Sequence, residues 1–474
     1  MSLRRIDLRF ALPHQVRRAT VLGLDSWRTG LEQAGVVLAE DGDLDLAVAP
    51  VERAKEVVAL GARAVVLEGR GGARRLRRAG YATRRYLPLP TIDSPDLILP
   101  LGRDDPVGYA LKTWRPAESW PKRARNRALT GLAQIGALPD PRPLQTLGLL
   151  DPGPPTPIAA AERLGVPLDA RWFLTLGQGD ALTRAVFHLF RRGTREPAWV
   201  LKVARVQGYD EPFVRDEAGL TLVRQAGGSA LRHAPNLLGR IDVHGHHASV
   251  ETAAVGERLS TLLPRDAAAG RRAFADISGW VTDVGKETAA RNALDEELAR
   301  LRQDVLTRWD APGGLVSGLS ALPAVLQHND LGTWNVVSAG PGRFTVLDWE
   351  SSRGNGLPLW DLLYFSVDGL GQLDRARSAE QRAEHAVRLL RGELSSSRTL
   401  FEAVRRYVGE LELPAESVGR LATLCWLHHG LSHVTRGAAA APVGGSAELP
   451  PAERIAPLWM QDPLLGPGWD RWRS

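Results

Sequence analysis

Residues 327–350 constrain the fold of this chain more than any other segment. They read QHNDLGTWNVVSAGPGRFTVLDWE, in which four residues separate Asp330 from Asn335 and an apolar run then leads to Asp348. Phosphoryl transfer needs a carboxylate beside the acceptor hydroxyl, oxygen ligands for Mg²⁺, and a rigid spacing between them. Asp and Asn supply hard oxygen ligands, which suit Mg²⁺ better than His or Cys. The segment therefore indicates phosphotransfer chemistry.

A plain turn is the competing explanation, because Asp and Asn are common in turns. His328 before the pair and Leu-Asp-Trp-Glu after it make that explanation a poor one. The flanking apolar runs, VL and VV, predict that the polar residues sit on a turn held by a hairpin, which is a rigid mount.

The segment resembles the catalytic and metal-binding loops of the aminoglycoside phosphotransferase family, which shares the protein-kinase fold and includes choline- and homoserine-kinase-like enzymes. The family pattern is His-Gly-Asp, four residues, Asn, and a strand that ends in Asp-Trp/Phe-Glu. The resemblance implies that Asp330 orients or deprotonates the acceptor hydroxyl. It assigns Mg²⁺ binding to Asn335 and Asp348. It also implies structural roles for His328, which braces the loop, and for Asp361 in LWDLLYF.

One residue departs from the family pattern. Asn329 stands where the family has Gly between His and Asp. Asn tolerates a positive φ better than other non-glycine residues, so we expect the loop to keep its shape.

If the resemblance holds, the residues that precede this segment should bind ATP through a Lys on a strand and a Glu on the following helix. Lys202 lies in the apolar run AWVLKVA, where an unpaired ammonium is costly to bury. Glu217, in RDEAGLTLVRQ, is its expected partner, and Asp216 is the alternative acid. An edge-strand Lys and a helix-surface Glu remain the simpler alternative. The order and spacing relative to the later motifs favour the nucleotide-binding interpretation.

Two further elements of an ATP site are expected. Gly177 and Gly179, in GQGD, would let the backbone approach the phosphates, although a plain hairpin competes with this interpretation. Residues 249–253, SVETA, would form the crossover between two lobes. The resemblance implies adenine binding by backbone groups there, at Glu251 and Ala253.

The chain divides into four predicted parts. Residues 1–137 alternate short strands and helices, which predicts a small α/β accessory domain of unknown role. Residues 138–157, rich in Pro, predict a linker. Residues 158–437 predict the phosphotransferase domain, with a β-rich N-lobe over 158–254 and a larger helical C-lobe over 255–437. Residues 438–474 are expected to be a linker and tail. The fold class is thus α+β, a bilobal protein-kinase-like fold behind an α/β domain.

Composition limits the cellular setting and the partners. Cys425 is the single cysteine and the formal net charge is +6, which permits an anionic partner without requiring one. With no apolar run long enough for a membrane helix, a cytoplasmic protein without membrane contact is expected. Residues 70–85 hold seven arginines, which suit nucleic acid or a phosphorylated partner. Because no nucleic-acid module accompanies them, a solvated helix face is expected and nucleic acid is not. A protein partner of the accessory domain stays open.

The acceptor is expected to be a small molecule. Twelve residues separate Asp348 from Asp361, and no Ala-Pro-Glu follows, so no platform for a peptide is evident. Residues 361–436 hold ten acidic residues and ten arginines, which does not favour a polycationic antibiotic over a sugar or amino alcohol. The sequence thus predicts an enzyme that uses ATP and Mg²⁺ to phosphorylate a small-molecule hydroxyl. The alternative is a catalytically silent kinase-fold module that binds nucleotide or a protein.

Overall fold

The computed structural model describes residues 3–102, 104–114, 120–134, 144–176, 184–291, 293–440 and 464–473. These residues form two compact units. The first comprises Met1–Phe213 and Asn236–Ala253, and the second comprises Val214–Pro235 and Ala254–Ser474. The fold is α+β, because strands dominate the first unit and helices the second.

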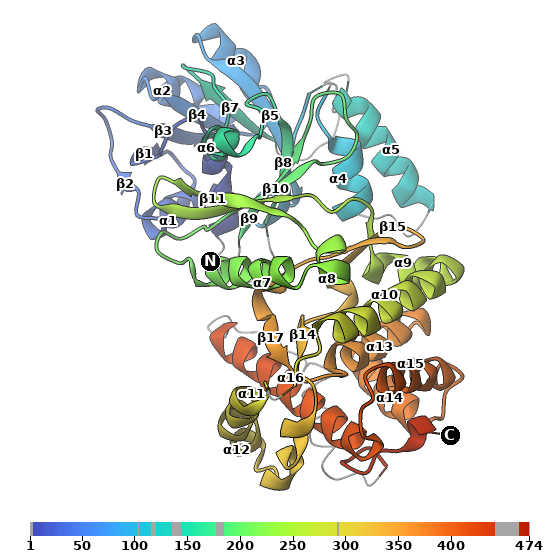
Figure 1. The fold of residues 1–474 in the computed structure, drawn as a ribbon. Coiled ribbons are helices and arrows are strands. Elements are labelled where there is room, and N and C mark those ends of the chain that lie inside the picture. Colours follow the sequence, from blue (N-terminus) through green and yellow to red (C-terminus); the bar gives the residue numbers. More distant parts are fainter. Residues whose placement is uncertain are drawn as a thin grey trace. The chain divides into compact units, whose positions relative to one another are not determined.

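A single twelve-stranded sheet organises the first unit, in the order β11-β12-β10-β9-β8-β6-β5-β7-β4-β3-β1-β2 (Figure 1). Its strands are β1 (Arg18–Val21), β2 (Val37–Leu38), β3 (Leu46–Pro50), β4 (Ala64–Glu68), β5 (Ala82–Pro90), β6 (Pro95–Pro100), β7 (Gln145–Leu149), β8 (Arg171–Leu176), β9 (Ala185–Phe190), β10 (Trp199–Val203), β11 (Leu237–Val243) and β12 (His246–Thr252). Strands β2, β1, β3 and β4 run parallel to one another, and the other pairings are antiparallel.

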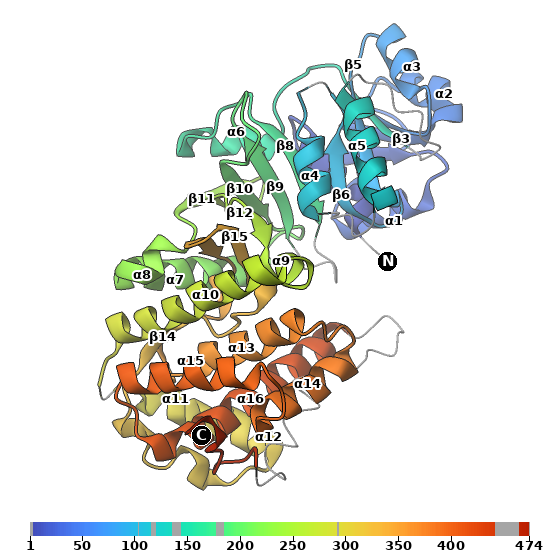
Figure 2. The ribbon, with the colours of Figure 1, turned by 90° about the vertical axis from the view of Figure 1, so that its right-hand side faces the viewer.

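Helices cover both faces of the accessory part of this sheet. They are α1 (Asp25–Gln33), α2 (Ala54–Ala59), α3 (Gly72–Arg78), α4 (Val107–Trp114) and α5 (Trp120–Gln134), with 3-10 turns η1 (Leu3–Ala11) and η2 (Val51–Arg53). Helix α6 (Thr156–Ala161), followed by the 3-10 turn η3 (Glu162–Leu164), packs on β11 instead. Val48 faces one core with Trp27, while Ala47 faces another with Leu76. Burial on both faces explains why β3 and β4 are continuous apolar runs. Figure 2 shows α4 and α5 side by side along the sheet near β6.

The accessory part and the expected N-lobe share one sheet rather than forming separate layers. Strand β6 pairs with β8 through Leu97–Thr175 and Ile98–Leu174. One buried cluster also continues from Trp27 to residues of β8–β12. The pairing satisfies backbone N–H and C=O groups of β6 and β8 that would otherwise be unpaired strand edges. The sequence pattern does not specify which strands pair in this way.

The prediction of a linker over residues 138–157 is wrong where the structure describes it. Strand β7 lies inside that range and pairs antiparallel with both β4 and β5. It can do so because its own residues, QTLGL, contain no proline. Residues 138–143 lie outside the described part of the chain.

The second unit is mainly helical. Its helices are α7 (Glu211–Ala226, from Val214 onward), α8 (Gly228–Arg232), α9 (Leu259–Arg265), α10 (Ala267–Thr288), α11 (Asp295–Arg300), α12 (Thr307–Trp309), α13 (Trp360–Leu373), α14 (Ala379–Arg391), α15 (Ser397–Glu410) and α16 (Val418–Ala440). A π-helical turn η4 (Leu301–Leu306) and 3-10 turns η5 (Gly313–Val316), η6 (Leu319–Ala321), η7 (Thr333–Asn335), η8 (Trp349–Ser351), η9 (Ala415–Ser417) and η10 (Arg471–Arg473) complete it. None of the helices in the described residues combines the length and apolar character that a membrane crossing requires.

Helix α13 lies at the centre of the helical packing in this unit. It contacts α9, α10, α14, α15 and α16. All but a few of its side chains are buried, from Trp360 to Gly371. The segment 464–473, within the expected tail, also packs here: Trp469 Nε1 donates to the carbonyl of Leu390 at 2.9 Å, and Trp472 is buried.

Two small sheets carry the candidate site. Strands β13 (Glu257–Arg258), β15 (Val336–Gly340) and β16 (Arg343–Val346) form one, and β14 (Val325–Gln327) and β17 (Arg353–Gly356) form the other. The predicted hairpin around the Asp330 loop is therefore wrong. The strands on either side of the loop, β14 and β15, belong to different sheets, and the hairpin is formed by β15 and β16.

Candidate active site

His328 fixes the start of the loop between β14 and β15. It is 1% exposed, and its Nε2 lies 2.8 Å from the carbonyl oxygen of Leu347. Its Nδ1 accepts from the amide of Asp330 at 3.2 Å. Since a carbonyl only accepts and an amide only donates, the pair of bonds selects the neutral tautomer with hydrogen on Nε2. The ring thus ties the loop to the residue just before Asp348.

Asp361 holds the same loop from helix α13. Its two carboxylate oxygens accept from the amides of His328 at 2.6 Å and Asn329 at 2.8 Å. Burial raises the pKa of Asp361, while His328 and the two amide donors oppose that rise. Asn329 adopts a φ of 63°, so the expected left-handed conformation at this position is confirmed.

Asp368 is a second acidic anchor, which the sequence analysis missed. Its Oδ2 accepts from the amide of Thr333 at 2.8 Å, and burial raises the pKa of its carboxyl group. Asp361 and Asp368 lie seven residues apart on α13. Two turns of helix bring such residues to the same face, so this spacing was the available signal.

Asp330 and Asn335 are joined directly. The Nδ2 of Asn335 donates to the carbonyl oxygen of Asp330 at 2.9 Å and lies 3.3 Å from its Oδ2. The carbonyl of Asn335 in turn accepts from the amide of Leu347 at 2.7 Å, which sets the start of the Asp348 turn. These bonds join Asp330 to Asn335, and Asn335 to the residue that precedes Asp348.

Asp348 has a left-handed backbone, with φ 63° and ψ 65°. Such a conformation costs about 1–3 kcal/mol in a residue other than Gly and persists only where its surroundings hold it. Arg258, on the neighbouring strand β13, is a charged residue that the sequence analysis did not single out. Burial lowers the pKa of Arg258, and the negative charge of Asp348 opposes that shift. The carboxylate thus faces a cation within its own unit.

Helix α7 is fitted against the Asp348–Glu350 turn. The carboxylate of Asp216, 3% exposed, accepts from the amide of Trp349 at 3.1 Å. A Cβ at Gly219 would lie 2.1 Å from the carbonyl oxygen of Trp349 and 2.5 Å from Ser352 Oγ. Only Gly allows the helix to approach this closely. Asp216, expected only as an alternative partner of Lys202, therefore supports this turn.

In the first unit, Lys202 pairs with Glu251. Their Nζ and Oε1 atoms lie 2.6 Å apart, and the two side chains are 14% and 4% exposed. Lys202 opposes Ser249 on β12, so Glu251 is its diagonal neighbour on the same sheet face. The expected partner, Glu217, lies on the part of α7 that belongs to the second unit. An ion pair of Lys202 with Glu217 stays a prediction.

The other expected nucleotide contacts have different outcomes. The amide of Ala253 donates to the carbonyl of Ala198 at 3.0 Å. Adenine binding by backbone groups at Glu251 and Ala253 stays a prediction. Gly177 and Gly179 lie outside the described residues.

Comparison with solved structures returns several aminoglycoside phosphotransferases. A thermostable mutant of APH(4)-Ia, in a ternary complex with ADP and hygromycin B, is 16% identical over 58% of this chain and 89% of its own, with a TM-score of 0.34. A type VIII aminoglycoside-3'-phosphotransferase is 16% identical over 49% and 97%, with a TM-score of 0.30. APH(3'')-Id from Streptomyces rimosus is 14% identical over 51% and 86%, with a TM-score of 0.32. All three are aminoglycoside phosphotransferases.

These three structures carry the name of the family that residues 327–350 resemble, but identities and TM-scores this low assign no family to this chain. The identities and TM-scores are too low to carry activity or substrate across to this chain. No protein-family model matches the chain. A search of curated proteins gives no match either. The functional assignment therefore depends on the geometry within each unit.

Proposed function

We propose that this protein is an ATP- and Mg²⁺-dependent phosphotransferase that moves the γ-phosphoryl group to a hydroxyl of a small molecule. The observation that carries the proposal is the pair of bonds at Asn335: its Nδ2 donates to the carbonyl of Asp330 at 2.9 Å, and its carbonyl accepts at 2.7 Å from Leu347, the residue before Asp348. In this proposal Asp330 serves the hydroxyl, and Asn335 and Asp348 are the oxygen ligands of the metal. The acceptor class, a sugar, an amino alcohol or an aminoglycoside-like molecule, stays open.

The donor set fits Mg²⁺. Because the Nδ2 of Asn335 donates to Asp330, its Oδ1 is the atom that would bind the metal. Asp348 adds a carboxylate. No group of three or more His, Cys, Asp or Glu side chains in the described residues could hold a metal ion by itself. Mg²⁺ typically uses one or two protein ligands, with water and phosphate oxygens completing its shell. When bound, it neutralises charge on the transferred phosphoryl group.

The residues of the chain have separate proposed roles in the reaction. Asp330 accepts the proton of the acceptor hydroxyl or orients it for in-line attack. His328, Asp361 and Asp368 keep the loop in place, so Asp330 need not reorganise during the reaction. Lys202 supplies a cation for the nucleotide phosphates.

The short connection between Asp348 and Asp361 supports a small acceptor. Turn η8 and strand β17 occupy it, and α13 begins at Trp360. No stretch remains in this connection for an ordered peptide-binding segment of the protein-kinase type.

Transfer of label from γ-labelled ATP to a panel of hydroxylated metabolites and aminoglycosides tests the proposal. Asp330→Asn should lower transfer by about 10²–10⁴-fold, because Asn cannot accept the proton. Asp283→Ala, an exposed helix position, is the matched control and should keep full activity. Full activity of a folded Asp330→Asn protein would refute the role of Asp330.

A second candidate is a kinase-fold module that binds nucleotide without transferring phosphate. The ion pair of Lys202 with Glu251 favours it, because a Lys held by a strand neighbour has less freedom to meet phosphates. Thermal-shift titration with ATP, with and without Mg²⁺, followed by an ATPase assay, separates the two candidates. A shift without turnover or transfer would favour the silent module.

A further inference from the structure

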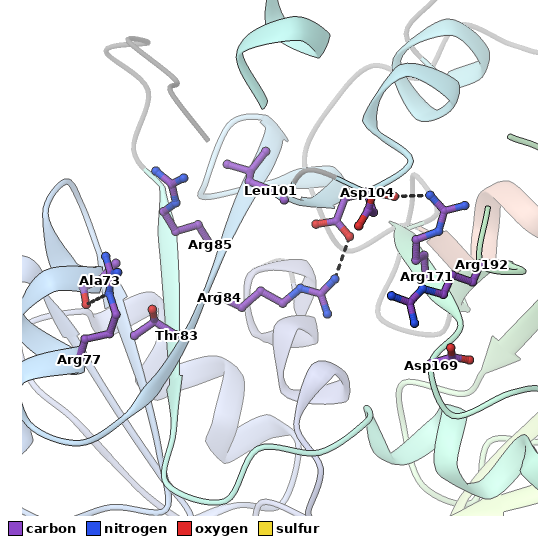
Figure 3. A pocket seen from close by; sticks show the side chains of 12 residues that line it. Ala73, Arg77, Thr83, Arg84, Arg85, Leu101, Asp104, Asp169, Arg171 and Arg192 are labelled. Atoms are coloured by element: carbon purple, nitrogen blue, oxygen red, sulfur yellow. Dashed lines mark hydrogen bonds and ion pairs between the residues drawn. The ribbon is translucent and has the colours of Figure 1, made fainter. Parts of the chain in front are cut away.

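An arginine-rich cavity of about 750 Å³ lies in the first unit, and none of the residues assigned above lines it (Figure 3). Five arginines and three aspartates line it. The arginines come from α3 (Arg77), β5 (Arg84 and Arg85), β8 (Arg171) and the turn after β9 (Arg192). The volume is in the range of sites for small organic ligands. Three of these arginines belong to the run at residues 70–85 that was expected to be a solvated helix face.

Two of the arginines form the frame of the cavity. Arg84 Nη2 lies 2.9 Å from Asp105 Oδ1, and the guanidinium lies over the Trp172 ring at 5.6 Å. Arg171 donates to main-chain carbonyls, those of Arg191 at 3.1 Å and Thr194 at 2.5 Å, and also to that of Asp104. Its Nε is buried with no hydrogen-bond partner. These bonds give the cavity fixed walls and leave one buried donor unsatisfied, which a ligand or water would satisfy.

Two other arginines leave charge at the opening. Arg77 and Arg192 are exposed, and Arg77 bonds only within its own helix, to Ala73 at 3.2 Å. Figure 3 shows Arg77 on one side of the cavity and Arg192 on the other, with Arg84 reaching between them. Once Asp105 is paired with Arg84, the remaining four arginines outnumber Asp104 and Asp169. The side chains that line the cavity therefore carry a net positive charge. A guanidinium group can donate two parallel hydrogen bonds to the oxygens of a phosphate.

The aspartates narrow the class of ligand. Asp104 and Asp169 are exposed at the cavity and can accept hydrogen bonds from hydroxyl groups. Their carboxylates would repel a molecule that carries negative charge along its whole length. We propose that this cavity binds a small phosphate monoester that carries hydroxyl groups, as a sugar phosphate does. Because β5 and β8, which both line the cavity, lie on either side of β6, such a ligand would strengthen the sheet where β6 makes its short pairing with β8.

Binding is measured on the full-length protein by calorimetry and thermal shift in EDTA, which removes Mg²⁺ from the proposed nucleotide site. The probes are glucose 6-phosphate, glucose, inorganic phosphate and a single-stranded oligonucleotide. We expect glucose 6-phosphate to bind and raise the melting temperature, phosphate to bind more weakly, and glucose not to bind. Affinity should fall as salt is added.

Two variants at the cavity and one outside it locate the binding. Arg192→Gln and Arg77→Gln should each weaken glucose 6-phosphate binding about tenfold or more, since each removes a charge-assisted contact. Arg195→Gln changes the net charge equally at an exposed position outside the cavity and should bind as the wild type does. Equal affinity in all three variants, or no binding at millimolar concentration, would overturn the proposal. Oligonucleotide binding that is lost in Arg192→Gln, without sugar phosphate binding, would replace it with a nucleic-acid site.

Discussion

The main-chain amide of Trp349 donates a hydrogen bond to the buried carboxylate of Asp216, 3.1 Å away. The bond joins helix α7 to the turn that presents Asp348 and Glu350. The position of a proposed metal ligand is thus coupled to a helix more than a hundred residues earlier in the sequence. Any change in α7 that moves Asp216 should also move this turn.

Replacing Asp216 tests the coupling. Asp216→Ala leaves the amide of Trp349 without this acceptor and should lower the free energy of unfolding by about 1–3 kcal/mol. It should also raise the Mg²⁺ concentration needed for half-maximal phosphotransfer, because the Asp348 turn loosens. Asp216→Asn keeps an acceptor oxygen and should fall between Ala and the wild type. Unchanged unfolding and unchanged Mg²⁺ dependence in Asp216→Ala would show that the bond is incidental.

Two helical glycines provide a matched pair. Gly219→Ala would place a methyl group 2.1 Å from the Trp349 carbonyl, so we expect helix α7 to shift and the protein to lose stability and activity. Gly409→Ala, on α15, has no atom within 4 Å of its added methyl. It should stabilise the protein by about 0.5–1 kcal/mol, as Ala does in an open helix position. Urea unfolding of both variants measures the contrast, and similar changes in the two would contradict close packing at Gly219.

Asp361 gives a stability effect that depends on pH. Because burial raises the pKa of Asp361 above its ordinary value of 3.8, the folded state holds this proton more readily than the unfolded state does. Its contribution to stability is therefore largest below pH 3.8 and declines as pH rises through the folded pKa. Asp361→Asn cannot titrate and loses one acceptor for the loop amides. The loss should lower the free energy of unfolding by about 1–3 kcal/mol. Unfolding of both proteins from pH 4 to 7 tests this, and an unchanged stability difference across that range would exclude the titration.

His246 should act in the opposite direction in the first unit. Burial, with help from Arg9, lowers the pKa of His246 from 6.5 to about 4, and its Nδ1 donates to the carbonyl of Ala204 at 2.8 Å. Between those pH values the unfolded chain takes up a proton that the folded chain does not. Stability should therefore fall as pH is lowered from 6.5 to about 4.

His246→Asn can keep the donor to Ala204 without titrating, so its stability should vary less over this window. Denaturant unfolding at half-unit pH steps compares it with the wild type. Parallel pH profiles would assign the acid sensitivity to other groups.

Local patterns determined much of this protein. Short apolar runs with β-branched residues, such as AVVLE, favour strands over helices, so such strands were predictable. Asp330, Asn335 and Asp348 lie within one short stretch of sequence, and the bond between Asn335 and Asp330 is local to it. Asn329 adopts a positive φ, which Asn tolerates better than most residues. These features depend on neighbours in the sequence, and the sequence alone was enough to identify them.

Tertiary structure decided what depends on distant partners. Strand β7 lay hidden in a proline-rich range because its bonding partners are β4 and β5, far away in the chain. Lys202 needed an acid, but only the register of β10 against β12 selects Glu251. Asp216 and Gly219 matter because a particular carbonyl and amide lie opposite them. Such contacts depend on how segments far apart in the sequence pack together, and the local pattern of residues does not specify that packing.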